Sequence, residues 1–159
     1  MRSTFDYCPI VWIFCGKTNC YKLEKLQERA LRIIYKDTSS PCECLLQNTG
    51  LLPLRLYLIR CLLIEVFKCV HGNCPAYLNN MFEIKMSNYD MRSNCQLVQK
   101  PFTTMKYGYR SFQYFGSKVW NSLPVDIKRI QDFNLFKQHV TKWLTDGKCD
   151  DYRSIAEIC

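Results

Sequence analysis

The sequence has few of the residues and motifs that build enzyme active sites and metal centres. It contains only two histidines, His71 and His139, which stand alone. Its one Asp-Asp pair, at residues 150–151, lies in a polar stretch near the C-terminal end. No C-x-x-C pair, phosphate-binding glycine loop, nucleophile elbow or paired-carboxylate site is present. We therefore expect no catalytic residue, no metal ligand set and no cofactor.

Long apolar runs are also missing. A spanning helix needs about 20 apolar residues, and the nearest candidate is the segment 54–70. It carries four charged residues, Arg55, Arg60, Glu65 and Lys68. Because placing them in hydrocarbon would cost several kcal/mol in total, we interpret this segment as a buried core helix. The apolar residues 5–15 are interrupted and lack a small-residue cleavage site, so we expect neither a secretory signal nor a membrane partner.

Cysteine, in contrast, is abundant. The chain has eleven, an odd number, and Cys42 and Cys44 are too close in sequence for an ordinary zinc pair. Several, such as Cys61 and Cys69, occupy apolar helix positions. We interpret them as thiols in an intracellular, reducing compartment, nuclear or cytoplasmic. A disulfide framework and a metal-stabilised cysteine module remain alternatives.

The overall composition predicts a folded, basic protein. With 159 residues the chain suits one domain, and 48% hydrophobic and 14% aromatic residues provide a core. The net charge of +8 favours polyanionic partners, which are nucleic acid, anionic lipid or acidic protein.

Helical periodicity dominates the chain. We predict a mainly α fold, a single helical domain of about six helices, two of them short, with a small extended or β element near residues 96–104. The first expected helix starts near Pro9. The others cover residues 20–36, 41–48, 54–70, 111–122 and 132–147, and short turns follow Pro75 and Pro124. Ser39 or Ser40 is expected to cap the helix 41–48, and Asp132 the last one.

The segment 20–36 has the clearest two-sided pattern. Its predicted core face consists of Leu23, Leu26, Ala30, Ile33 and Ile34. An adjacent stripe is basic and consists of Lys22, Lys25, Arg29, Arg32 and Lys36. Such a stripe can contact several phosphates of a duplex at once, although an ordinary solvated helix face would show the same pattern. Glu24 and Glu28 are expected to offset part of the positive charge.

A second basic cluster interleaves with aromatic residues. It consists of Lys100, Lys106, Arg110 and Lys118, among Phe102, Tyr107, Tyr109 and Tyr114. Interleaving of this kind can hold a nucleic-acid backbone and stack its bases. The alternative, which we favour, is that the aromatic residues belong to the core and the lysines border it. Asn121 is interpreted as a helix-end cap rather than a base reader.

Three segments resemble one known family in their order and spacing. The first is F-D-Y-C-P-I-V-W at residues 5–12, with Tyr7, Cys8 and Trp12, followed by K-L-E-K-L-Q-E-R-A-L-R-I at 22–33. The second is N-Y-D-M-R at residues 88–92. The third, at residues 110–128, contains Phe112, Tyr114, Gly116, Trp120, Asn121 and Pro124. Together they resemble the C-terminal thumb and post-thumb region of reverse transcriptases from jockey-like non-LTR retrotransposons.

The resemblance implies a part of an RNA-directed DNA polymerase that lacks the catalytic palm. The family's Y-x-D-D aspartates, which hold magnesium in the palm, have no counterpart here, so we expect no independent catalysis. The implied partners are an RNA–DNA hybrid or duplex, held by the basic residues of 22–33, and the missing palm and fingers. From the charge pattern, and not from the resemblance, we add Lys36, Arg110 and Lys118 to the expected nucleic-acid contacts. Lys36 lies just past the matching helix.

The resemblance also suggests a division of the chain. We expect a thumb-like helical part at 1–82, an extended connector at 83–109, a C-terminal helical part at 110–147 on the same core, and a flexible tail at 148–159. The alternative function is a small helical protein–protein interaction or scaffold module, using the apolar helix 54–70 and the C-terminal aromatic face, or an inert retroelement remnant.

Overall fold

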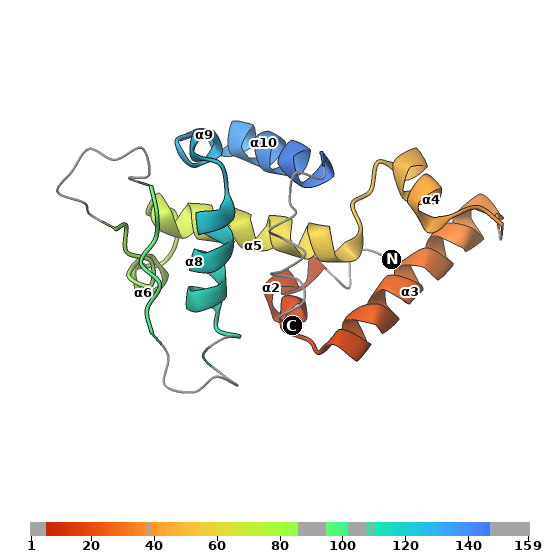
Figure 1. Ribbon diagram of the computed structural model, residues 1–159, viewed down its shortest axis with the longest axis horizontal. Coiled ribbons are helices and arrows are strands. Elements are labelled where there is room, and N and C mark those ends of the chain that lie inside the picture. The colour runs from red at the N-terminus through yellow and green to blue at the C-terminus, as the bar shows by residue number, and fades with distance from the viewer. Residues whose placement is uncertain (1–5, 38, 86–94, 102–107, 109, 147–159) are drawn as a thin grey trace. The chain divides into compact units, whose positions relative to one another are not determined.

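The structure, a computed structural model, is mainly helical, as predicted (Figure 1). It describes residues 6–37, 39–85, 95–101, 108 and 110–146. Within these ranges helices account for 67% of the residues, in eight helices of which five have seven or more residues. No strand forms there; the expected extended element near 96–104 contributes one isolated antiparallel bridge between Ile84 and Leu97. None of the described helices has the length and apolarity needed to cross a membrane.

The chain divides into two compact units, residues 1–59 and residues 60–158, with helix α5 running through the boundary. The first unit contains α2 (Pro9–Ile13), α3 (Lys17–Tyr35), α4 (Cys42–Thr49) and the start of α5 (Leu54–Val70). The second contains the rest of α5, then α6 (Ala76–Asn79), α8 (Phe112–Ser122), α9 (Val125–Lys128) and α10 (Phe133–Thr145).

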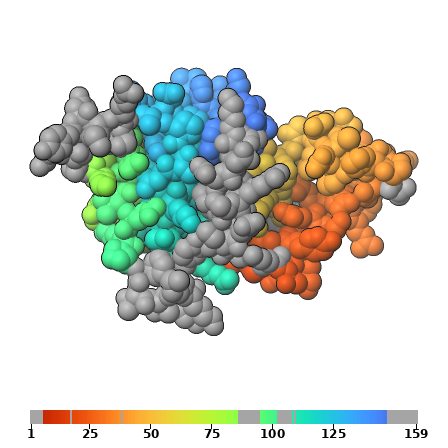
Figure 2. All heavy atoms as spheres, in the orientation of Figure 1, coloured from red at the N-terminus to blue at the C-terminus, as the bar shows by residue number. Residues whose placement is uncertain are grey.

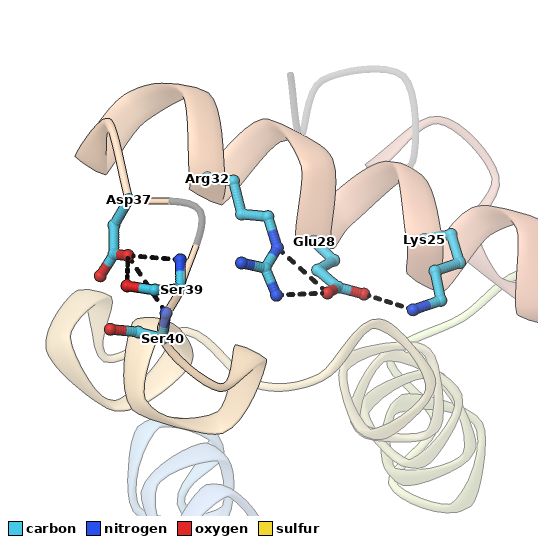
Figure 3. Close-up of polar contacts among 6 residues, drawn as sticks. All are labelled: Lys25, Glu28, Arg32, Asp37, Ser39 and Ser40. Atoms are coloured by element: carbon cyan, nitrogen blue, oxygen red, sulfur yellow. Dashed lines mark hydrogen bonds and ion pairs between the residues drawn. The ribbon is translucent and has the colours of Figure 1, made fainter.

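The α3–α4 corner is built from local signals. Lys36 ends α3 in a left-handed conformation, with a φ of 50°, and the backbone N–H of Asp37 donates to the Arg32 carbonyl at 3.2 Å. The Asp37 carboxylate then accepts from the backbone N–H of Ser39 at 2.9 Å and of Ser40 at 3.1 Å (Figure 3). Hydrogen bonds from the Ser40 side chain, and then from Ser39, lower the pKa of Asp37.

These serines therefore do not cap the next helix, and that prediction was wrong. Pro41 occupies the N-cap position of α4, without a side-chain hydrogen bond to the helix. Gly50 ends α4 with a φ of 62°, a conformation that glycine adopts without strain. Leu31 of α3 forms a small core with Leu45 and Leu46 of α4, against which Cys42 and Leu51 pack. The atoms of α3 and α4, in red-orange and orange, lie against each other in Figure 2.

The predicted core face of α3 was also wrong. Leu31 is only 3% exposed, whereas Leu26, Ile33 and Ile34 are 54%, 67% and 68% exposed. The reason is that the neighbours cover the adjacent side of the helix. On that side Gln27 donates to the Leu52 carbonyl at 3.2 Å and accepts from the Leu54 N–H at 2.9 Å. The start of α5 is thereby fixed beside Gln27 and Leu31.

The second unit has an aromatic and aliphatic core. Phe67 of α5, Trp120 of α8 and Phe136 of α10 are at most 1% exposed. The Phe136 ring stacks on Phe67 with centroids 4.2 Å apart and on Trp120 at 5.9 Å. Helix α5 is thus the buried helix that the sequence predicted over 54–70, and α8 and α10 pack on its second half (Figure 1). Asp132 caps α10 as predicted, accepting from the N–H groups of Asn134 and Leu135.

The expected division of the chain stays a prediction. The first compact unit ends within α5, whereas the expected thumb-like part extends to residue 82. In the expected connector, two backbone hydrogen bonds of 2.8 Å flank the Ile84–Leu97 bridge, from Lys85 to Gln96 and from Val98 to Glu83. Residues 148–159 lie outside the described ranges, as does the 88–92 segment.

Candidate nucleic-acid interface

The basic stripe lies on the solvent side of α3. Lys22, Lys25 and Arg29 are exposed, and Arg32 is half-buried. Lys36, also exposed, follows the last turn of the helix. Residues three and four apart are neighbours on a helix surface, so these cations form one continuous row.

Glu28 is the electrostatic centre of this row. Its carboxylate accepts from Lys25 Nζ at 2.8 Å and from Arg32 Nη2 at 2.8 Å and Nε at 3.1 Å (Figure 3). The hydrogen bonds from Lys25 and Arg32 lower the pKa of the Glu28 carboxyl, and the one from Lys25 has the largest effect. The hydrogen bond to Glu28 in turn raises the pKa of Lys25. The pairing confirms that Glu28 offsets part of the positive charge.

The remaining cations of the row are unneutralised. Among the described residues, Lys22, Arg29 and Lys36 form no salt bridge. These three side chains are therefore the cations of the stripe with the most freedom to contact an external anion.

An aromatic side chain that the sequence analysis missed lies beside the stripe. Tyr21 is 61% exposed, and Lys25 Nζ lies 5.7 Å from the centroid of its ring. A hollow of about 610 Å³ runs along this part of α3, lined by Tyr21, Lys22, Lys25, Leu26, Glu28, Arg29 and Arg32. The spacing of four residues between Tyr21 and Lys25 would have been enough to place the two side by side.

The second predicted cluster is only partly described. Arg110 is exposed just before α8, and Lys118 is half-buried on α8. Lys100 is paired with Glu83 at 2.6 Å, so its charge is offset. Lys106 and the predicted aromatic partners Phe102, Tyr107 and Tyr109 lie outside the described residues. Tyr114 is half-buried, and its backbone N–H donates to Oγ of Ser111, the N-cap residue of α8.

Most residues of the 110–128 motif have structural roles. Phe112 meets the Phe82 ring edge to face, with centroids 5.2 Å apart. Gly116 is buried and lies so close to α5 that an added Cβ would be only 3.0 Å from Val66 Cγ2. Trp120 donates from Nε1 to the Cys95 carbonyl at 3.1 Å. Pro124 is the N-cap residue of α9, as its expected place before that turn suggests.

Asn121 does not cap a helix end, and that interpretation was wrong. Its Oδ1 accepts from the Leu97 N–H at 2.8 Å, and its Nδ2 donates to the Leu97 carbonyl at 3.0 Å. The backbone carbonyl of Asn121 accepts from Lys128 Nζ at 2.9 Å. Lys128, the last residue of the motif, is only 7% exposed, and burial lowers its pKa. The side chains of Asn121 and Lys128 are therefore both hydrogen-bonded to the protein's own backbone.

The N-terminal motif forms a short local structure. Trp12 donates from Nε1 to the Tyr7 carbonyl at 3.3 Å. Cys8 has a left-handed conformation, with a φ of 50°, at the N-cap of α2, and Pro9 begins that helix as expected. Tyr7 is 79% exposed.

A second basic surface was not predicted. In the second unit, Arg60, Lys137 and Lys142 line a hollow of about 790 Å³ together with Asn134, Gln138, Thr141 and Thr145. Arg60 Nε donates to Thr141 Oγ1 at 2.7 Å. The signal in the sequence was that no acidic residue occurs between Asp132 and Asp146.

The described residues contain no group of three or more His, Cys, Asp or Glu side chains that could hold a metal ion. Comparisons with protein-family models, with curated proteins and with solved structures found no match. The resemblance to non-LTR reverse transcriptases therefore continues to depend on the three sequence segments alone.

Proposed function

We propose that this chain is a part of a non-LTR retrotransposon reverse transcriptase that contacts the template–primer duplex and performs no chemistry of its own. The observation that carries the proposal is the exposed basic row of α3, with the three unneutralised cations Lys22, Arg29 and Lys36. The family is inferred from the three sequence segments that occur in the same order as in those reverse transcriptases. With the family, the proposal includes the missing palm as a partner and an intracellular, reducing location.

The geometry of the row suits a polyanion. Lys22 and Arg29 are two helical turns apart, about 10 Å along the helix axis. A DNA duplex carries one charge per about 1.7 Å of its axis, so this distance is spanned by several phosphates. The exposed Tyr21 ring adds a flat apolar surface on which an unpaired base could stack.

Phosphate contacts of this kind predict a strong salt dependence. Three to five cations in contact with phosphates give a slope of log K against log salt of about −3 to −4.5. Lys25 and Arg32 are already bonded to Glu28, so their contribution should be smaller than that of Lys22 and Arg29.

The test is binding of the full chain to a labelled RNA–DNA hybrid across a salt series. We expect Lys22→Gln/Arg29→Gln to reduce the magnitude of the slope by about 2. The matched control is Lys68→Gln/Lys100→Gln, which removes the same charge from two lysines already paired with Glu65 and Glu83. Absence of binding at low salt by a folded sample, or equal weakening by both double substitutions, would refute the proposal.

Glu28 supplies an opposite test of the same surface. Glu28→Gln removes the carboxylate that Lys25 and Arg32 share, so the two cations become available to phosphates. We expect tighter hybrid binding at low salt and a slope steeper by about 1 to 2. Glu24→Gln, an exposed change of the same charge on the same helix, should have the smaller effect.

The second candidate function, a protein–protein interaction module, is favoured by a different observation. The surfaces that we expected for it are buried, since Leu62 and Phe136 are each 0% exposed. The exposed apolar side chains include three on one helix, Leu26, Ile33 and Ile34 of α3. Self-association of the wild type in sedimentation, abolished by Ile33→Gln/Ile34→Gln and accompanied by no hybrid binding, would favour this candidate over the first.

A further inference from the structure

Two pairs of cysteines, each five residues apart, bring their sulfur atoms close together. Cys15 Sγ and Cys20 Sγ lie 3.2 Å apart where α2 ends and α3 begins. Cys69 Sγ and Cys74 Sγ lie 3.5 Å apart at the C-terminal end of α5. A disulfide bond is about 2.05 Å long, so each pair needs only a small approach of its two sulfur atoms.

The two pairs differ in access. Cys15 and Cys20 are both half-buried. Cys69 is only 3% exposed. Burial, together with the hydrogen bond to Cys74, raises the pKa of the Cys69 thiol to about 12. Because the thiolate is the nucleophile in thiol–disulfide exchange, the pair at the end of α5 is protected, whereas the half-buried pair at the start of α3 is accessible.

We propose that Cys15 and Cys20 are a reversible redox site that forms an intrachain disulfide by exchange with a low-molecular-weight disulfide such as oxidised glutathione. One cysteine thiolate attacks a sulfur of the glutathione disulfide, forming a mixed disulfide and releasing one glutathione thiolate. The second cysteine thiolate then attacks the protein sulfur of the mixed disulfide and releases the second glutathione. Two protein thiols are oxidised, one glutathione disulfide is reduced to two thiols, and these take up the two protons.

The bond would tie the end of α2 to the first turn of α3. Gly16 is the N-cap of α3, and its carbonyl accepts from the N–H groups of Asn19 at 2.9 Å and Cys20 at 3.0 Å. Cys20 Sγ also lies 3.4 Å from the Cys15 carbonyl oxygen. Closing the sulfur bridge across Gly16 therefore restrains the turn from which the basic row of α3 extends. The bridge would form whether or not that row binds nucleic acid.

The sequence makes the bond easy to detect. Trypsin cuts after Lys17 and Lys22, so a Cys15–Cys20 disulfide joins the peptide ending at Lys17 to the peptide 18–22. Cys8 lies in the same first peptide, and Cys8→Ser removes that ambiguity. Cys69 and Cys74 share one tryptic peptide and serve as the internal control, read as a loss of two hydrogen atoms.

The experiment incubates the reduced, full-length wild type and Cys8→Ser proteins in a series of glutathione redox buffers, followed by alkylation, digestion and mass spectrometry. We expect the cross-linked 18–22 peptide in both proteins, and not in Cys15→Ser or Cys20→Ser, at a redox poise where Cys69 and Cys74 remain reduced. Hydrogen exchange in residues 18–22 should slow several-fold in the oxidised protein. If Cys15 and Cys20 stay alkylatable, or are only glutathionylated separately, at every poise that oxidises exposed Cys44, the proposal is overturned.

Discussion

The Asn121 side chain pairs with both backbone polar groups of Leu97, in the manner of a neighbouring strand. Its Oδ1 accepts from the Leu97 N–H at 2.8 Å and its Nδ2 donates to the Leu97 carbonyl at 3.0 Å. Leu97 itself is 2% exposed. One helix side chain thereby satisfies the backbone N–H and C=O groups of a buried residue in an extended segment. Among the described residues this segment belongs to no sheet and forms only the isolated bridge to Ile84.

Asn121→Ala should destabilise the protein by about 2–4 kcal/mol, because each buried backbone group left without a partner costs about 1–3 kcal/mol. The measurement is urea denaturation followed by circular dichroism. Asn48→Ala, which changes an exposed asparagine on α4, should alter the free energy of unfolding by no more than about 0.5 kcal/mol. Equal stability of Asn121→Ala and wild type would show that Asn121 does not hold Leu97 in solution.

Gly116→Ala should cost about 1–2 kcal/mol of stability. The added methyl group would lie 3.0 Å from Val66 Cγ2 and 3.2 Å from Phe82 Cζ, and overpacking of this kind costs about 1–3 kcal/mol. The better helix propensity of alanine returns about 0.5–1 kcal/mol. In a Val66→Ala background the cost of Gly116→Ala should decrease, because the closest contact is gone. Strict additivity of the two substitutions would contradict the predicted contact.

Lys128 should make stability depend on pH in the alkaline range. Burial lowers its pKa in the folded state below the ordinary 10.5, so the unfolded chain binds more protons as the pH approaches that value. The wild type should therefore gain stability relative to Lys128→Met as the pH rises towards 10.5. Comparing the two proteins cancels the titration of tyrosines. Lys128→Arg, which keeps its charge throughout, should show no such gain; parallel profiles for wild type and Lys128→Met would contradict the lowered pKa.

Phe136→Ala should be among the most destabilising substitutions in the second unit. The ring is fully buried between Phe67 and Trp120, and truncation of such a side chain typically costs about 3–5 kcal/mol. The neighbouring Leu135 is 50% exposed, so Leu135→Ala provides a matched control with a loss of about 0.5 kcal/mol or less. Similar losses for the two variants would mean that α10 does not pack as described.

The helices could be predicted because their signals are local. Gly50 and Gly72 end α4 and α5 in left-handed conformations, Pro75 opens α6, and Asp132 caps α10. Periodicity and charge also identified the basic row of α3 and the carboxylate of Glu28 that pairs with it. These features depend on residues within one or two turns of each other, so no knowledge of distant neighbours was needed.

The candidate site was only partly predictable. Lys22 and Arg29 are exposed as expected. The structure adds that Lys25 and Arg32 are bonded to Glu28 whereas Lys22 and Arg29 are not, a difference that the sequence spacing alone did not predict. Arg60, Lys137 and Lys142 come from helices far apart in the sequence, so their shared surface could not be found from a single helix.

By itself, then, the sequence determined a helical, basic chain, the positions where its helices begin and end, and the stripes of like residues along each helix. The tertiary structure decided which stripe is buried. On α3 the side with Leu31 and Gln27 is covered, and the more apolar stripe with Ile33 and Ile34 is exposed. The physical reason is that periodicity fixes the angle between side chains on one helix, whereas burial depends on where α4 and the start of α5 pack against it.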